Sequence, residues 1–205
     1  MASTFITGPA GKIEIAIDAP HATARNIVFV MFHPNPLEQG SMTNKVVTST
    51  CRAMQDLGIT CVRFNFPGVG QSEGQLGTGD IEIKTALAVI DWVREQYANS
   101  TLWLGGFSFG GGVAAHIAND CTANQLLTIA PAFKFFDDMP VPTMPWVLIQ
   151  GDADEIVSFK ANQDWLSEHN ANCKVIAFQG VGHFFHGQVV RLRDKIKSIY
   201  SERLP

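Results

Sequence analysis

The chain has 205 residues, with 15 lysines and arginines against 19 aspartates and glutamates, and a formal net charge of −4. A chain of this length buries roughly 70% of the surface that it exposes when unfolded, so one hydrophobic core can stabilise it without disulfides or a structural metal. The acidic balance and the lack of a lysine- and arginine-rich run exclude a protein that binds nucleic acid through a basic surface. We therefore expect a single domain over residues 1–205.

Apolar segments and cysteines argue against two further classes of protein. The longest apolar run, residues 27–32, is far shorter than the roughly 20 residues that a membrane-spanning helix needs. No lysine or arginine precedes the short apolar patch at the N-terminus, which is unlike a signal peptide. The four widely spaced cysteines indicate reduced thiols, not a metal or redox motif: Cys51, Cys61, Cys121 and Cys173. We expect a cytoplasmic protein that binds neither membranes nor nucleic acid.

Apolar runs alternate with helical patterns along most of the chain, which is typical of β-α-β units around a parallel sheet. The first two runs, residues 4–7 and 13–18, predict an antiparallel hairpin joined by a Gly-Pro-Ala-Gly turn. Six further strands are expected at residues 26–32, 60–66, 102–105, 126–130, 146–150 and 174–178. The predicted class is α/β, with a mostly parallel central sheet and helices on both faces.

Three stretches between or after these strands have the spacing of amphipathic helices. Apolar residues recur every three or four positions over residues 47–57, and Gly58 is placed to end that helix. A second apolar stripe covers residues 83–97, with Asp80 in the region of its N-cap. A third stripe covers residues 189–199.

A serine between glycines follows the strand expected at residues 102–105. Residues 106–110 read Gly-Phe-Ser-Phe-Gly, a G-x-S-x-G motif, and a helical stretch follows at residues 113–118. Strand, motif and helix in this order are typical of a nucleophile elbow, where a sharp turn exposes a serine hydroxyl at the carboxyl edge of the sheet. The alternative is a glycine-rich turn that binds phosphate or nothing. We interpret Ser108 as the nucleophile.

A nucleophilic serine needs a general base and an acid that orients this base, expected further along the chain in the order Ser, Asp, His. Asp154 lies in the loop after the strand at 146–150, and His183 lies in the loop after the next strand. Both loops follow parallel strands and reach the same edge of the sheet as Ser108. Asp154 is therefore the predicted acid and His183 the predicted base. Alternatives in the same loops are Asp152 and Glu155 for the acid, and His186, at the start of the last helix, for the base.

An acyl-transfer reaction also needs two N–H donors for the oxyanion that develops on the substrate. One is expected from the backbone of Phe109, directly after the nucleophile. The second is expected from the loop after the strand at 26–32, where two prolines have no N–H; Asn35 is the first choice and Leu37 the second. We interpret His33, in the same loop, as a residue that braces the loop and not as a catalyst.

Motif segments follow one another over nearly the whole chain, at residues 33–36, 40–47, 63–74, 106–112, 151–154 and 182–186. Together and in this order they resemble the small, lid-less bacterial α/β-hydrolases. The resemblance implies an α/β-hydrolase fold without a cap domain, a triad of Ser108, Asp154 and His183, and a carboxylesterase-type activity without a cofactor. A metal enzyme is a further alternative, which the lack of an H-x-x-x-H or H-E-x-x-H spacing argues against. Asn35 and Pro67 depart from the common pattern on loops near the expected pocket, so the resemblance does not extend to the substrate.

The interval between residues 131 and 144 is too short for the helical lid that many such enzymes insert there. We therefore expect an open, shallow site with apolar walls, in which Leu37 and Phe184 contact a small ester or thioester substrate. Further apolar residues on these loops are Phe133, Phe135, Phe136, Met139 and Phe185. The chain is expected to be a monomer or a homodimer. Alternative functions are a non-catalytic binding protein of the same fold and a peptidase or acyl transferase that uses the same triad.

Overall fold

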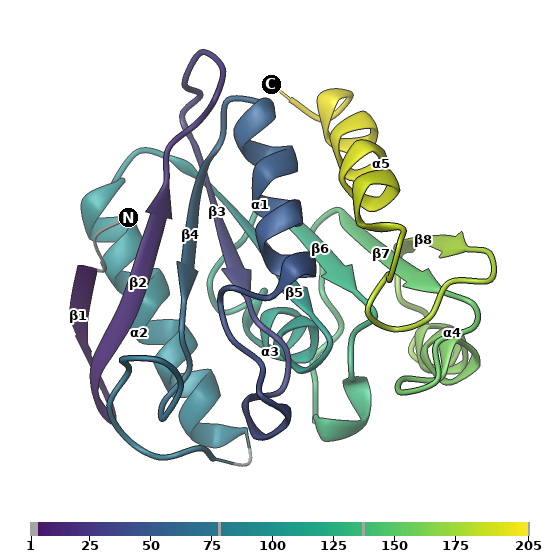
Figure 1. Ribbon diagram of the computed structural model, residues 1–205, viewed down its shortest axis with the longest axis horizontal. Helices are drawn as coiled ribbons and strands as arrows, with labels where there is room; N and C mark the ends of the chain where they lie inside the picture. The colour runs from purple at the N-terminus through teal and green to yellow at the C-terminus, as the bar shows by residue number, and fades with distance from the viewer. Residues whose placement is uncertain (1–3, 78, 137, 205) are drawn as a thin grey trace.

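The computed structural model describes residues 4–77, 79–136 and 138–204. Its centre is one eight-stranded sheet with the strand order β1-β2-β4-β3-β5-β6-β7-β8 (Figure 1). The strands are β1 (Thr4–Gly8), β2 (Gly11–Asp18), β3 (Ile27–Phe32), β4 (Thr60–Phe64), β5 (Thr101–Phe107), β6 (Gln125–Ile129), β7 (Trp146–Gly151) and β8 (Cys173–Phe178). Strands β3 to β8 are parallel, and β2 is antiparallel to both of its neighbours. The predicted fold class is confirmed.

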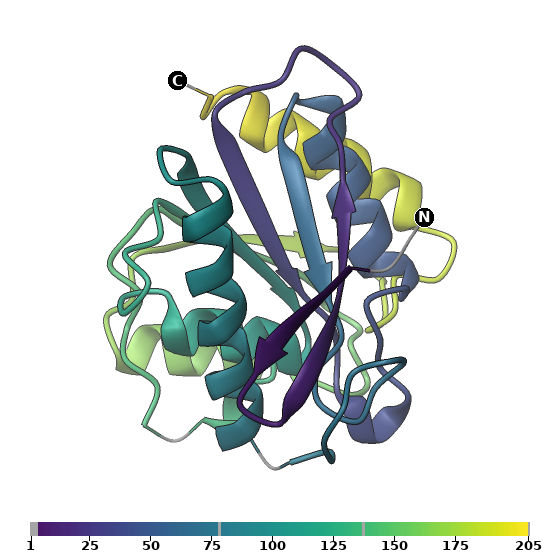
Figure 2. The same cartoon turned by 90° about the vertical axis from the view of Figure 1, so that its left-hand side faces the viewer.

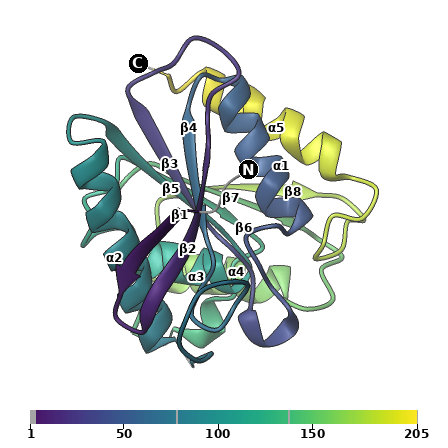
Figure 3. The same ribbon diagram turned by 60° about the vertical axis from the view of Figure 1, so that its left-hand side comes forward.

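Helices cover both faces of this sheet, with α1 and α5 on one face and α2, α3 and α4 on the other (Figures 2 and 3). The helices are α1 (Lys45–Asp56), α2 (Asp80–Gln96), α3 (Phe109–Ile117), α4 (Phe159–Glu168) and α5 (Val189–Ser201). Two single turns of 3-10 helix, η1 (Pro36–Glu38) and η2 (Phe133–Phe135), lie in the loops after β3 and β6. Among the described residues, no helix is both long and apolar enough to cross a membrane.

Strand β3 shows why the central strands are apolar at every position. All six of its residues are buried. Val28, Val30 and Phe32 belong to the core under α2, α3 and α4, whereas the alternate residues belong to the core under α1 and α5. Successive side chains of a strand point to opposite faces, so a sheet covered on both faces needs apolar residues at both parities.

Several element boundaries differ from the sequence prediction. Helix α3 begins at Phe109 and includes the three glycines that the prediction left outside it. Helix α2 has Gly79 as its N-cap, so Asp80 is the first helical residue and not the cap. Strand β4 ends two residues earlier than predicted, at Phe64. The spacing of the Asp154 and His183 loops left room for a helix, but no bounds were predicted for α4. His186 lies in the turn before α5 and not within that helix.

The described part of the chain between β6 and β7 holds no lid. The described residues between β6 and β7 contain only the single turn η2, and β7 resumes the sheet beside β6. The loops after β3, β5, β6, β7 and β8 all leave the same edge of the sheet, because these strands are parallel neighbours. This edge is where the predicted site residues gather.

Candidate active site

Ser108 occupies a strained turn between β5 and α3, with φ 55° and ψ −121°. A positive φ in a residue other than glycine costs free energy and persists only where the surroundings fix it. Here the Ser108 N–H donates to the carbonyl of Ile129 at 2.9 Å, and the Ser108 carbonyl accepts from the N–H of Ala132 at 3.0 Å. The end of β6 and the loop after it therefore hold the backbone of the predicted nucleophile.

The two glycines of the motif permit close contacts between backbone segments. A Cβ atom at Gly106 would lie 2.1 Å from the carbonyl oxygen of Gly110. A Cβ atom at Gly110 would lie 2.3 Å from the carbonyl oxygen of His33. Only hydrogen fits at both positions, so the first turn of α3 can pack directly against β5 and the end of β3.

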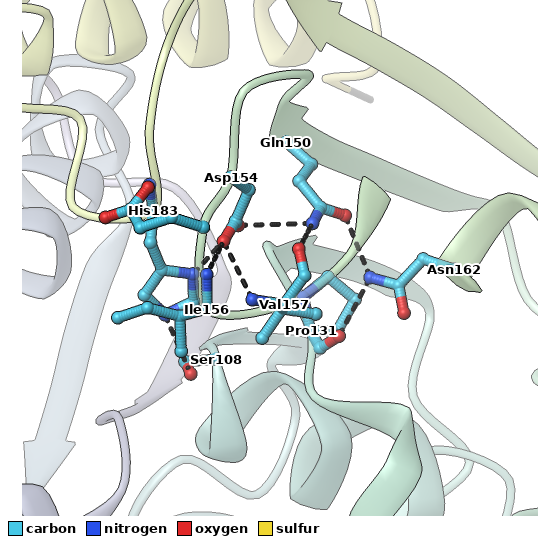
Figure 4. A network of polar contacts seen from close by, with 9 residues as sticks. Ser108, Pro131, Gln150, Asp154, Ile156, Val157, Asn162 and His183 are labelled. Atoms are coloured by element: carbon cyan, nitrogen blue, oxygen red, sulfur yellow. Dashed lines mark hydrogen bonds and ion pairs between the residues drawn. The ribbon is translucent and has the colours of Figure 1, made fainter. Parts of the chain in front are cut away.

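Ser108, His183 and Asp154 form one hydrogen-bonded chain, although they come from three different loops (Figure 4). His183 Nε2 lies 3.0 Å from Ser108 Oγ, and His183 Nδ1 lies 2.8 Å from Asp154 Oδ2. The side chains of His183 and Asp154 are 2% and 0% exposed. The imidazole also contacts the rings of Phe107 and Phe184, with centroids 5.0 Å and 5.1 Å away. The structure thus brings together the three side chains that the sequence nominated.

Four donors surround the Asp154 carboxylate. Its Oδ1 accepts hydrogen bonds from the backbone N–H groups of Ile156 at 3.0 Å and Val157 at 2.8 Å. Its Oδ2 accepts from His183 and, at 3.2 Å, from Gln150 Nε2. Burial by itself would raise the pKa of the Asp154 carboxyl, but the bonds from His183, Val157 and Ile156 outweigh burial and hold this pKa below its ordinary value. Asp154 is therefore charged near neutral pH.

The charge on Asp154 assigns the protons of its neighbour. A carboxylate only accepts hydrogen bonds, so His183 Nδ1 carries a proton and donates a hydrogen bond to Asp154. In the neutral imidazole, Nε2 is then an acceptor for the hydroxyl proton of Ser108. This tautomer can remove the hydroxyl proton when Ser108 reacts.

The alternative acids brace the loop that carries His183 and do not contact its ring. Asp152 Oδ1 accepts from the backbone N–H of Gly180 at 2.6 Å, and Glu155 Oε2 accepts from the backbone N–H of His183 at 3.2 Å. The alternative base, His186, lies against the ring of Phe184 at a centroid distance of 5.7 Å. None of the three takes part in the hydrogen-bonded chain to Ser108.

The loop after β3 distinguishes between the two candidates for the second oxyanion donor. The Leu37 N–H donates to the side-chain oxygen of Asn35 at 3.0 Å and is therefore occupied. Within the described part of the chain, the backbone N–H groups of Asn35 and Phe109 have no hydrogen-bond acceptor. Of the two candidates in this loop, Asn35 therefore has the unoccupied N–H, and its role as an oxyanion donor together with Phe109 stays a prediction.

His33 braces this loop as expected. Its Nε2 accepts from the backbone N–H of Phe66 at 3.0 Å, and its Nδ1 donates to the carbonyl of Pro34 at 2.7 Å. Burial lowers the pKa of His33 to about 4, although the bond to Pro34 acts in the opposite direction. The ring is neutral near pH 7 and ties the loop after β3 to the segment after β4.

The apolar residues near the triad divide into exposed and buried ones. Leu37, Phe135 and Phe184 are 65%, 48% and 37% exposed. The other aromatic and methionine side chains considered for the walls are buried: Phe133, Phe136, Met139 and Phe185. Of these, Phe133 still borders a surface cavity beside α4. Leu37 and Phe184 are therefore accessible to a substrate, and their contact with one stays a prediction.

Two cavities flank the triad loops. One of about 310 Å³ lies between η2 and α4 and includes Ile156 and Val157. The other, of about 290 Å³, lies between the start of α1 and Phe184. No group of three or more His, Cys, Asp or Glu side chains within the described ranges is arranged to hold a metal ion.

Sequence reasoning missed Gln150, which donates directly to the predicted acid. The only signal was a lone amide at the end of β7, whose other residues before Gly151 are all apolar. A polar side chain at such a buried position must find a partner, and the carboxyl edge of the sheet is where the partners lie.

Residues 45–121 match the family profile described as alpha/beta hydrolase fold. The chain is 34% identical to an uncharacterized protein of Rickettsia prowazekii over 202 residues, which cover 90% of this chain and 82% of the relative. A structure of an alpha-beta serine hydrolase homologue from Coxiella burnetii is similar with a TM-score of 0.92 and 35% identity, over 96% of both chains. A serine hydrolase without lid from Xanthomonas campestris is similar with a TM-score of 0.94 and 39% identity, over 100% of this chain and 95% of the other.

Proposed function

The chain belongs to the alpha/beta hydrolase family, as a member without a lid, and from this premise we propose that it hydrolyses small carboxylic esters or thioesters through an acyl-enzyme intermediate. One observation carries the proposal: Ser108 Oγ, His183 and Asp154 form a continuous hydrogen-bonded chain, and Ser108 lies on a strained turn. A serine at its ordinary pKa is a weak nucleophile, and a neutral imidazole within hydrogen-bond distance is the group that activates it.

In the first step, Ser108 Oγ attacks the carbonyl carbon of the ester while its proton moves to His183 Nε2. Asp154, already charged, stabilises the imidazolium that forms. The N–H groups of Phe109 and Asn35 receive the oxyanion. The tetrahedral intermediate then collapses, and the leaving alcohol or thiol takes the proton from Nε2.

In the second step, water attacks the acyl group on Ser108, and His183 again acts as the base. The proton returns to Ser108 Oγ when the carboxylic acid leaves. Access of water to the acyl-enzyme is supported by the described part of the β6–β7 connection, which contains no lid helix. The exposed side chains of Leu37 and Phe184 support a small apolar acyl or leaving group as the substrate feature that binds.

The test is hydrolysis of p-nitrophenyl esters of graded acyl length, together with labelling by a fluorophosphonate probe. The wild-type protein should turn over short esters and be labelled, whereas Ser108→Ala should do neither. Circular dichroism shows whether the variant is folded. A wild-type protein that is neither active nor labelled would instead favour a binding protein of the same fold, and a strong preference for amides or alcohol acceptors would favour a peptidase or acyl transferase.

A further inference from the structure

A second set of buried polar contacts lies on the side of Asp154 that faces away from Ser108 (Figure 4). Gln150 is fully buried at the end of β7. Its Nε2 donates to Asp154 Oδ2 at 3.2 Å and to the carbonyl of Val157 at 2.8 Å. Both protons of this amide are therefore used to hold the loop that carries the predicted acid.

Gln150 is itself held by a buried asparagine on α4. Asn162 Nδ2 donates to Gln150 Oε1 at 2.8 Å and to the carbonyl of Pro131 at 2.9 Å. Asn162 is 4% exposed. The primary amide of Asn162 thus joins the end of β7 to the loop after β6.

The loop after β6 also holds the nucleophile. Pro131 precedes Ala132, whose N–H donates to the carbonyl of Ser108. The contacts therefore close into a ring that runs from Ser108 through His183, Asp154, Gln150, Asn162 and the 131–132 segment back to Ser108. One half of the ring is the proposed catalytic chain, and the other half fixes its two ends relative to each other.

We propose that Gln150 and Asn162 are positioning residues that set the Asp154 carboxylate relative to the turn that carries Ser108. This inference rests on the proposed hydrolase function. Asp154 receives its other donors from its own loop and from His183, whereas the Gln150–Asn162 pair connects it to a different part of the sheet edge. An acid held only within its own loop can move together with that loop, and a shift of about 1 Å is enough to impair a preorganised site.

The pair also acts on the charge of the carboxylate. Gln150 and His183 donate to the same oxygen of Asp154, Oδ2, so each hydrogen bond weakens the other. When the Gln150 donor is lost, Oδ2 binds the protonated base more strongly. The acid limb of the pH profile of kcat/KM should then move to higher pH, an effect that a purely structural role of Gln150 would not produce.

The central experiment compares Gln150→Met with Gln150→Glu in steady-state ester hydrolysis. Methionine has a similar length but neither donates to Asp154 nor accepts from Asn162. Glutamate keeps the shape and the acceptor for Asn162; in its ionised form it lacks the donor and places a second negative charge beside Asp154. We expect kcat to fall roughly 10-fold or more in both variants with KM within about twofold, because a hydrogen bond to a charged group is lost.

A double-mutant cycle tests whether the two amides act as one unit. Asn162→Leu keeps a similar size but removes both donated hydrogen bonds. If the ring positions the acid, the double variant with Gln150→Met should lose about as much kcat as Gln150→Met alone. Losses that multiply would show that the two residues act independently and would overturn the proposal.

Thr128→Val is the matched control, because Thr128 is a fully buried polar residue on β6 that lies outside the ring. Its hydroxyl accepts from Trp146 Nε1 at 3.0 Å. This variant should lower the melting temperature without changing kcat or the pH profile. Folded Gln150 and Asn162 variants that behave like this control refute the positioning role. A wild-type protein without activity or labelling would refute the proposed function itself, which is a different result.

Discussion

The two sides of the candidate site are fixed by different physical means. Ser108 is fixed by backbone contacts, because its N–H and its carbonyl both form backbone hydrogen bonds. The glycines beside it have no Cβ atom, which allows α3 to pack closely against β5 and the end of β3. Asp154 is held by donors that converge on its carboxylate, two of them from side chains. Substitutions that add atoms on the nucleophile side should therefore lower stability and activity. On the acid side, the loss of a hydrogen-bond donor or acceptor should lower activity even when the shape of the side chain is kept.

The largest effect is expected from Asp154→Asn, which changes the chemistry of the acid side and preserves its shape. An amide can donate its N–H₂ to His183 Nδ1 and so favour the tautomer in which Nε2 carries the proton and cannot accept from Ser108. We expect kcat for a p-nitrophenyl ester to fall about 10³- to 10⁴-fold. The melting temperature should change by only a few degrees. A loss of less than tenfold would show that the carboxylate does not set the tautomer.

The nucleophile side is tested by adding a single methyl group. Gly106→Ala places a Cβ atom 2.1 Å from a backbone carbonyl oxygen that cannot easily move. We expect a loss of about 3 kcal/mol or more in the free energy of unfolding, measured by urea titration, together with loss of activity.

Gly180→Ala is the control for this substitution. Gly180 has a φ of +68° but no atom within 4 Å of the added Cβ position. The backbone conformation alone should cost about 1 kcal/mol. Equal losses for the two variants would show that the close contact at Gly106 has no special role.

His33, which ties the loop after β3 to the segment after β4, should make the free energy of unfolding depend on pH. The pKa of His33 is about 4 when folded and about 6.5 when unfolded, so the unfolded chain binds more protons between these values. Stability is therefore complete above about pH 6.5 and falls as the pH drops towards 4, by up to about 3 kcal/mol for this group. Urea titrations at pH 7 and pH 4.5 should show a smaller difference for His33→Gln than for the wild type. An equal difference in both proteins would exclude His33 as the source.

The smallest expected effect is a difference in stability between two inactive variants of Ser108, which measures the backbone strain at this residue. Ser108→Ala and Ser108→Gly both remove the hydroxyl, but only glycine relieves the positive φ. Glycine relieves the backbone strain in the folded state but also raises the conformational entropy of the unfolded chain. We expect the first effect to be larger, so Ser108→Gly should be more stable than Ser108→Ala by about 1 kcal/mol. Thermal melts of the two inactive variants measure this. A less stable glycine variant would mean that the turn is not strained.

The same contrast explains what the sequence could predict. The nucleophile side depends on neighbours along the chain, so strand, motif and helix could be recognised in one short segment. The order of Asp154 and His183 in loops after parallel strands sufficed to place them at one edge, because that edge is common to all parallel strands.

The support of the acid side could not be predicted because it joins distant residues. Asn162 lies on α4, and only Asn162 and Leu166 of that helix are buried. A polar residue at one of so few buried positions interrupts the apolar stripe, so periodicity did not reveal the helix. The start of α3 was also misplaced, since its glycines have low helix propensity and packing against β5 and β3 overrides this.

The short connection between β6 and β7 has a consequence for engineering. The Ala132 N–H bond to Ser108 and the Asn162 bond to Pro131 both lie at the very start of this connection. Chain inserted after residue 140 would leave both bonds in place, and each doubling of a flexible loop costs only about 0.6 kcal/mol. A designed lid could therefore be inserted in this segment to narrow the range of esters that the protein accepts, without changes to the residues of the site.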